Sequence, residues 1–227
     1  MPGRIRSLAV NGERAARPDP LLQADALAAI ARTGLHFATS AYDRERYEQI
    51  LAIAAEMAAG GLPGAAEAAG RLSADEIASR WRRDVGYVTP KVGVEAAVFD
   101  QDGRLLLMRR ADTGLWAMPG GWADVGDTPA GAAVREVREE TGVEARPVRV
   151  VGVYDSRSVG SRNPHHFFRI VFACAAVGGA PAPTAEALEV AFFAPDELPT
   201  VTRSHRRPLA DALAAWRDPS LPTAFDA

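Results

Sequence analysis

The hydrophobic positions follow a helical period in the first third of the chain. Apolar residues recur every three or four positions over residues 21–33, again from about residue 43 to 60, and over residues 73–83. Gly34 is expected to end the first helix, and Ser73 and Glu76 have the spacing of an N-terminal capping box for the third. Three short helices bury little apolar surface alone. We therefore expect them to pack on the rest of the chain or on a second copy.

From residue 91 onward the pattern changes to that of strands. Two strands are predicted over 92–99 and 105–109, with a turn at 100–103, and a loop follows over 111–118. After one intervening helix, the pattern predicts three more strands and a closing helix, over 148–154, 166–177, 188–193 and 205–216. This order indicates an α/β (α+β) fold, in which an α/β/α sandwich surrounds a mixed sheet and a small all-helical domain precedes it.

The intervening helix carries the clearest local signals in the chain. Thr128 is a good N-cap, Pro129 suits the first helical position, and Gly142 suits a left-handed C-cap. Glu136 and Glu140 stand one above the other on this helix, with Glu139 beside them. An adjoining face can pack on a sheet, and it consists of Ala130, Ala133, Val134 and Val137.

Three carboxylates in one place repel each other unless a positive charge lies among them. Arg135 and Arg138 flank the group but are predicted to point to its other side. Oxygen ligands suit a hard cation, so we expect Mg²⁺, with Mn²⁺ as an alternative, and a phosphate ester or anhydride as substrate. A solvated Glu/Arg face on a surface helix is the competing interpretation. The Gly120–Gly121 entry and the tight exit at Gly142 weigh against it.

Composition and charge exclude several classes of protein. The 227 residues are 48% hydrophobic and 24% charged, which is ordinary for a globular protein. A net charge of −3 argues against a sequence-independent grip on a nucleic acid polymer, and no stretch is apolar enough to span a membrane. Cys174 is the only cysteine and lies in an apolar run, so we expect a buried thiol, no internal disulfide and a cytoplasmic protein.

The stretch from Gly121 to Val143 resembles the signature of the Nudix hydrolases. That signature is Gly, five residues, Glu, seven residues, and Arg-Glu-aliphatic-x-Glu-Glu-x-Gly-aliphatic. The matching positions after Gly121 are Arg135, Glu136, Val137, Glu139, Glu140, Gly142 and Val143. Asp127 stands where the signature has Glu. The resemblance implies the Nudix form of the α/β/α sandwich.

The segment over residues 31–50 resembles the N-terminal helical extension of a Nudix subgroup that includes CDP-choline and ADP-ribose pyrophosphatases. Residues 86–99 and 114–126 resemble the same subgroup. We accordingly divide the chain into a disordered leader (1–20), an N-terminal helical domain (21–85) and a Nudix hydrolase domain (88–227). The helical domain is expected to form a homodimer.

The resemblance also implies roles for individual residues. Glu136 and Glu140 would be metal ligands, and Glu139 would hold a further metal through water or act as general base, which groups Glu139 and Glu136 as catalytic. Substrate contacts are expected from Arg110, Gly120, Gly121, Trp122 and Arg157. Further candidates are Arg162 for phosphate or ribose, and Glu186 and Glu189 as acids outside the signature.

The reaction implied is the splitting of a nucleoside diphosphate linked to another moiety, of the CDP-choline or ADP-ribose type, with release of a nucleoside monophosphate. The alternative is a Nudix domain that binds a nucleotide and regulates without hydrolysing it. Asp127 favours this alternative, whereas the three glutamates count against it.

Overall fold

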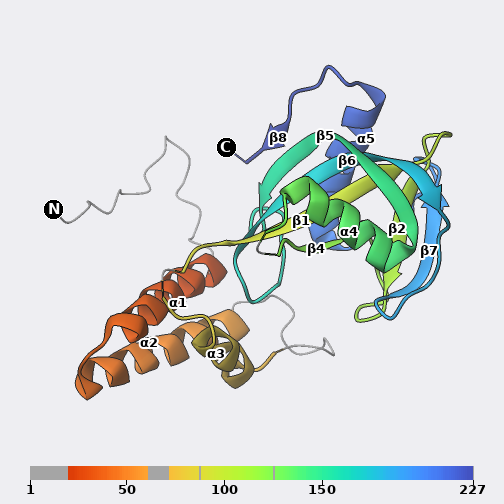
Figure 1. The fold of residues 1–227 in the computed structure, drawn as a ribbon. Coiled ribbons are helices and arrows are strands. Elements are labelled where there is room, and N and C mark those ends of the chain that lie inside the picture. Colours follow the sequence, from red (N-terminus) through yellow and green to blue (C-terminus); the bar gives the residue numbers. More distant parts are fainter. Residues whose placement is uncertain (1–19, 61–71, 87, 125, 227) are drawn as a thin grey trace. The chain divides into compact units, whose positions relative to one another are not determined.

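The computed structural model describes residues 20–60, 72–86, 88–124 and 126–226, and it divides into two compact units, Met1–Val88 and Thr89–Ala227 (Figure 1). The leader predicted over residues 1–20 lies outside the described residues except for Pro20, which begins the first helix. None of the described helices combines the length and apolar character needed to cross a bilayer.

The first unit consists of three helices, α1 (Pro20–Phe37), α2 (Ala41–Gly60) and α3 (Ala74–Arg82). The prediction that Gly34 ends α1 is wrong, because α1 continues for three residues beyond it. The reason is a close approach of two helices. A Cβ on Gly34 would lie 2.3 Å from the ring of Tyr47 in α2, so only glycine fits there without displacing the ring. The predicted capping box of α3 is confirmed, since Ser73 and Glu76 each accept from the other's backbone N–H.

The core of the first unit is built largely from alanines, with Leu51 and Trp81 as its largest fully buried side chains. Small side chains let the helices approach closely, and Trp81 fills the space that they leave. Arg32 is buried beside this core, where its Nε donates to the backbone oxygen of Asp84 at 2.6 Å and its guanidinium pairs with the Asp84 carboxylate. This pair ties α1 to the end of α3.

The second unit is built on a mixed sheet of eight strands. The strands are β1 (Lys91–Phe99), β2 (Leu105–Arg110), β3 (Trp116–Ala117), β4 (Gly120–Trp122), β5 (Val143–Asp155), β6 (Phe167–Gly179), β7 (Ala187–Phe193) and β8 (Ala224–Phe225). The main path runs β3-β2-β1-β6-β5-β8, while β4 pairs with β1 and β7 pairs with β2. The β1–β6 and β5–β8 pairs are parallel and the others antiparallel, which confirms the mixed sheet.

Helices cover both faces of the sheet, which confirms the α/β/α sandwich. On one face, Val137 of α4 (Pro129–Thr141) packs in a cluster with Val94, Val98 and Leu106. Figure 1 shows α4 crossing the front of the sheet. On the other face, Leu209 and Ala212 of α5 (Arg206–Arg217), which follows the 3₁₀ turn η1 (Arg203–His205), pack against a separate cluster of apolar strand residues.

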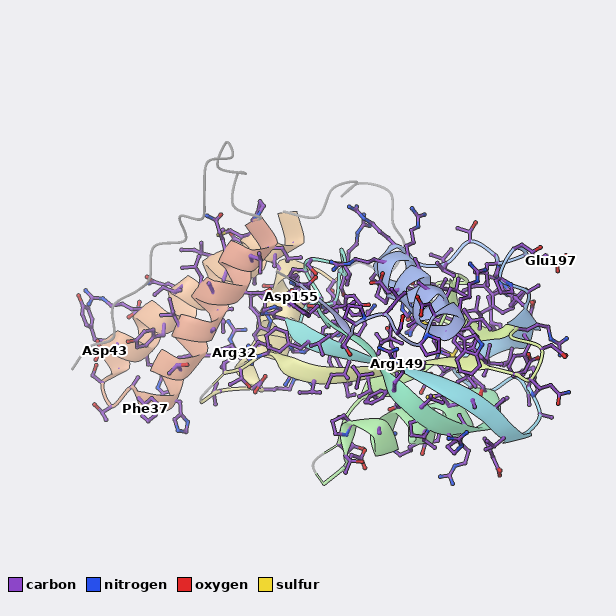
Figure 2. The ribbon with its side chains drawn as sticks, turned by 90° about the horizontal axis from the view of Figure 1, so that it is seen from above. Arg32, Phe37, Asp43, Arg149, Asp155 and Glu197 are labelled. Atoms are coloured by element: carbon purple, nitrogen blue, oxygen red, sulfur yellow. The ribbon has the colours of Figure 1, made fainter. Side chains whose placement is uncertain are left out.

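Several boundaries differ from the predictions. The segment predicted as a loop over 111–118 contains β3, and β4 follows directly after it; both strands are too short to show an alternating pattern. Strand β5 starts at Val143, at the end of α4, and the C-terminal strand β8 was not predicted. Arg149 of β5 holds that segment by donating to the backbone oxygens of residues 219 and 221; Figure 2 labels Arg149.

Candidate functional site

A cavity of about 710 Å³ opens in the second unit beside the predicted carboxylate helix. Its lining comes from β1, the end of β2 with the residues after it, Met118, β4, α4, the loop between β5 and β6, the start of β6, Glu186, and the segment 202–205. Residues far apart in sequence thus converge on one space of the size that small-molecule sites in proteins have.

The helix that carries the glutamates is fixed at both ends as predicted. The Thr128 hydroxyl accepts from the backbone N–H of Gly131 at 3.1 Å, and Pro129 occupies the first turn. Gly142 adopts φ 73° as a left-handed C-cap. The buried face differs slightly from the predicted one, because Ala132 is fully buried whereas Val134 is half-buried. Fixed ends leave the carboxylates on α4 little rotational freedom about the helix axis.

Glu140 is the most deeply buried of the three predicted carboxylates, with 5% of its surface exposed. Its Oε2 accepts from the backbone N–H of Gly120 at 2.7 Å. Burial raises the pKa of Glu140 to about 7, and repulsion from Glu136 and Glu186 adds to this, while the Gly120 N–H opposes it. A cation bound beside Glu140 would offset both causes of the raised pKa, because its charge favours the ionised carboxylate.

Glu136 lines the same cavity and is half-buried. Burial raises its pKa, although Arg135 opposes the shift. The glycine loop makes room for this side chain, since a Cβ on Gly121 would lie 2.7 Å from the Glu136 carboxyl group. Gly120 has a different reason to be glycine, because its Cβ would lie 2.2 Å from the backbone oxygen of Val94. The Gly120–Gly121 pair therefore lets β4 approach both β1 and α4.

Arg135 does not lie as predicted, and Glu139 lies beside Glu136 but outside the cavity. Glu139 does not line the cavity, and its side chain is 52% exposed. Arg135, predicted to point to the other side, instead lies among the acids. Its Nη1 donates to Glu136 and Glu139 at 3.0 Å each, and its Nη2 donates to Asp127 at 3.3 Å and to the Trp122 backbone oxygen at 3.1 Å. Arg135 thus supplies a positive charge within the acidic group and ties the glycine loop to α4.

Four of the five predicted substrate contacts line the cavity, namely Arg110, Gly120, Gly121 and Trp122. Arg110 makes a bidentate pair with Asp112 at 2.9 and 2.8 Å. The Trp122 indole is anchored edge-on against Phe167 and keeps 38% of its surface exposed. Arg110 and Trp122 therefore offer the cavity a charge and an aromatic face.

The fifth predicted contact, Arg157, does not line the cavity. It is 7% exposed, and its Nη1 donates to the backbone oxygens of Asn163 at 2.7 Å and Ser161 at 3.3 Å. It therefore braces the loop between β5 and β6 from inside. The neighbouring Arg162 of the same loop does line the cavity, together with Ser161 and Asn163. The sequence showed two arginines in one polar loop but not which of them turned inward.

The two acids proposed outside the signature differ in whether they line the cavity. Glu186 lines the cavity, whereas Glu189 on β7 pairs with Arg109 of β2 and does not. Within the described ranges, no three acidic, histidine or cysteine side chains already form a metal cluster. The donor set around Glu136 and Glu140 nevertheless suits a hard cation, since it consists of oxygens whose mutual repulsion a cation would relieve. Mg²⁺ typically takes only one or two carboxylates beside substrate phosphates and water.

A second charged group at the cavity was not predicted. Glu95 of β1, Arg169 of β6 and His205 form a buried polar cluster, each 5–7% exposed. The Glu95 Oε1 lies 3.0 Å from Arg169 Nε and 3.3 Å from His205 Nε2, and Arg169 also donates to the Ser204 backbone oxygen at 2.7 Å. Burial raises the pKa of Glu95 to about 7. The sequence did offer one sign of this cluster, because Glu95 and Arg169 are each the only charged residue in the interior of an apolar strand.

Comparison with known proteins agrees with the fold and the signature helix. Residues 89–213 match the NUDIX domain, and residues 18–68 match the UDP-X-like, N-terminal oligomerisation domain. A putative ADP-ribose pyrophosphatase of Bacillus subtilis (strain 168) is 34% identical over 209 residues, which span 91% of this chain and 96% of that protein.

Two crystal structures are similar over large parts of the chain. A UDP-X diphosphatase is 28% identical with a TM-score of 0.55, and the match covers 92% of this chain and 98% of that one. An ADP-ribose pyrophosphatase from Streptococcus suis is 34% identical with a TM-score of 0.54, and that match covers 61% of this chain and all of the other.

Proposed function

Because the chain belongs to the Nudix family and is a pyrophosphohydrolase, we propose that it hydrolyses the pyrophosphate bond of a nucleoside diphosphate linked to a second moiety, of the ADP-ribose or CDP-choline type. The observation that carries this proposal is the convergence of Glu136, Glu140 and Glu186 on a cavity that Arg110 and Trp122 also line. Acids at one side suit a cation and phosphates, while an exposed indole suits a nucleobase.

Glu136 and Glu140 are the residues proposed to hold Mg²⁺ or Mn²⁺, with Glu186 close enough to raise the pKa of both. A divalent cation bound there would neutralise charge on the phosphate oxygens and acidify a water, which are the two contributions that anhydride hydrolysis needs. Gly120 and Gly121 line the cavity beside these acids, and Arg110, whose Nε and Nη2 pair with Asp112, adds positive charge there for the phosphate.

Glu139 and Glu186 are the two candidates for the general base. Glu139 is exposed and paired with Arg135, which suits a residue that positions Arg135 and contacts a cation through water. Glu186 lines the cavity itself and so fits the base better. Since a base must reach the attacking water, Glu186→Gln is expected to lower kcat more than Glu139→Gln does.

Incubation of the protein with Mg²⁺ and a panel of nucleotides tests the proposal. The panel contains ADP-ribose, CDP-choline, NADH, nucleotide sugars and free triphosphates, and the phosphorylated products are measured. Turnover of a diphosphate derivative that chelation abolishes is the expected result. Tight binding of one compound without turnover of any would instead favour the regulatory alternative.

Asp127, the one departure from the signature, keeps a structural role in the glycine loop, which weakens the argument for the regulatory alternative. Its carboxylate accepts from Arg135 and from the backbone N–H of Asp124 at 3.4 Å. The shorter acid therefore still links the glycine loop to α4. This link helps to hold the loop in place.

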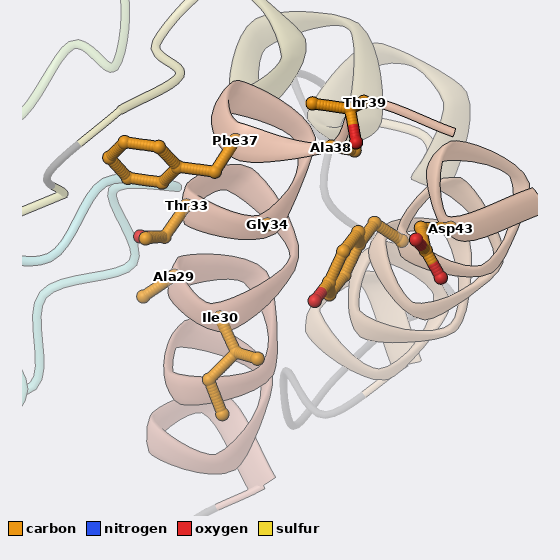
Figure 3. Close-up of a pocket in the computed structure, with 9 residues that line it drawn as sticks. Ala29, Ile30, Thr33, Gly34, Phe37, Ala38, Thr39 and Asp43 are labelled. Carbon is orange, nitrogen blue, oxygen red and sulfur yellow. The ribbon is translucent and has the colours of Figure 1, made fainter. Parts of the chain in front are cut away.

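The helices of the first unit are proposed to form a homodimer. The match of residues 18–68 to an oligomerisation domain supports this, as do the exposed side chains of Ile30 and Phe37, which are 59% and 55% exposed. Both project from α1 beside a hollow of about 620 Å³ (Figure 3). The double substitution Ile30→Asp with Phe37→Asp should yield monomers in light scattering. Leu221→Asp, an equally apolar exposed position in the second unit, is the matched control.

A further inference from the structure

Three buried polar atoms around the cavity lack a hydrogen-bond partner in the described part of the second unit. They are Glu95 Oε2, Thr202 Oγ1 and His205 Nδ1. All three residues line the cavity. Buried polar atoms are nearly always hydrogen-bonded in folded proteins, so three unpaired atoms in one place need an explanation. Because all three line the cavity, a ligand bound there could supply the missing hydrogen bonds.

The chemistry of the three atoms is that of hydrogen-bond acceptors. Glu95 uses Oε1 for Arg169 and His205, which leaves Oε2 to accept. Burial lowers the pKa of His205 well below its ordinary value, and Arg169 adds to this, so the ring is neutral. We place its proton on Nε2, which faces the carboxylate, and Nδ1 is then a bare acceptor. The Thr202 hydroxyl can accept or donate.

This acceptor set discriminates between parts of a nucleoside diphosphate derivative. Phosphate oxygens carry no proton to donate at neutral pH, so they gain nothing from Glu95 or His205. Amino and hydroxyl groups do carry such protons. Glu95, Thr202 and His205 line the same cavity as Glu136 and Glu140 of α4. One molecule can therefore reach both groups.

We infer that Glu95, Thr202 and His205 form a subsite that binds a hydrogen-bond-donating group of the substrate next to its pyrophosphate, either the amino group of the nucleobase or the hydroxyls of the second sugar. This inference rests on the proposed function. Arg169 positions Glu95 in this subsite and favours its charged form against the effect of burial, and it does not itself contact the donor group. The subsite would give the enzyme its choice among diphosphate derivatives.

Thr202→Val separates a ligand-binding role from a structural one. Valine has nearly the same shape as threonine, and the hydroxyl that it removes has no partner among the described residues and does not cap η1. We expect kcat/KM to fall about fivefold, as for one lost hydrogen bond, while Tm stays the same or rises. An unchanged kcat/KM would overturn the inference, and so would a loss of activity that merely follows a fall in Tm.

Glu95→Gln, assayed on three matched substrates, identifies the donor group. ADP-glucose and UDP-glucose share a sugar but differ in the amino group of the base. ADP-glucose and the methyl ester of ADP share a base but differ in the second sugar. A loss of kcat/KM that is about tenfold larger for ADP-glucose than for UDP-glucose identifies the base. A similarly larger loss relative to the methyl ester identifies the sugar, and either result supports the inference.

An equal loss on all three substrates would overturn the inference and leave Glu95 a structural role. Calorimetric binding of ADP-glucose in the presence of chelator gives a second readout that does not depend on turnover. Glu197→Gln, an exposed acid outside the cavity, is the control and should match the wild type. If the wild type hydrolyses none of the three compounds and neither ADP-ribose nor CDP-choline, the proposed function fails rather than the subsite.

Discussion

Glu140 and Glu95 are both buried carboxylates at one cavity, both with a pKa raised to about 7 by burial, yet their surroundings differ. Glu140 accepts from a backbone N–H twenty residues away, and two other acids repel it. Glu95 pairs with Arg169, seventy-four residues along the chain, and keeps one oxygen without a partner among the described residues. The first environment suits the proposed cation, whereas the second already contains a positive charge and suits the proposed neutral donor.

Glu140→Gln should have the largest effect on the first of these environments. The amide keeps the shape and can still accept from the Gly120 N–H, so the fold is expected to stay intact. Loss of a charged cation ligand should cut turnover at least ~100-fold. Steady-state kinetics with saturating Mg²⁺, alongside circular dichroism, checks this, and near-normal turnover would refute the metal assignment.

Arg169→Met tests the second environment through stability. Removing the guanidinium leaves Glu95 buried without its ion-pair partner. The cost is limited to about 2 kcal/mol because Glu95 can take up a proton. The pKa of Glu95 rises further in the variant, so the loss should be larger at pH 8 than at pH 6. Urea unfolding at the two pH values measures it; a loss that is the same at both would show that Glu95 is not the affected group.

Gly121→Ala shifts a carboxylate without removing it. The new methyl group would lie 2.7 Å from the Glu136 carboxyl, which is the movable end of a side chain. Turnover should fall roughly tenfold from the misplaced acid, with little change in Tm. Gly120→Ala is the contrasting variant, because its methyl group meets the Val94 backbone and should lower Tm. Equal thermal losses in both variants would contradict this distinction.

The wild type and Glu140→Gln should also differ in how their stability depends on pH. A carboxyl whose pKa is raised in the folded state favours folding at low pH, and this contribution is lost as pH rises from about 4.5 to 7. Without metal, Glu140→Gln should therefore gain about 2.5 kcal/mol on the wild type between pH 5 and pH 8. Adding Mg²⁺ should reverse the gap by stabilising only the wild type. Calorimetric Tm values provide the comparison.

The sequence predicted the first environment because its signals are local. Thr128, Pro129 and Gly142 fix the helix, and the spacing of Glu136 and Glu140 alone places both on one face. The direction of Arg135 could not be read in this way, because it depends on the glycine loop folding back toward α4. The prediction for Gly34 failed for a related reason. Glycine is needed there because Tyr47 of the next helix packs against it, and not because the helix ends.

The second environment depends on strands that are distant in sequence. Nothing near Glu95 indicates that Arg169 and His205 will lie beside it, because the parallel pairing of β1 with β6 and the start of α5 bring them together. Arg157 and Arg162 differ for the same reason. Only the folded loop decides which arginine braces the backbone and which lines the cavity.

The Glu95–Arg169 ion pair has a consequence for folding that is separate from any ligand. In the observed register of β1 and β6, Gly93 lies opposite Arg169 and Glu95 opposite Val171, so the two charges share one face of the sheet. A slip of β6 by one residue would turn Arg169 into the apolar cluster beneath α4 and leave Glu95 alone on the other face. Parallel strands that are distant in sequence pair slowly, because a long loop must close before they meet. The ion pair penalises a misaligned sheet while the chain folds, before any substrate is present.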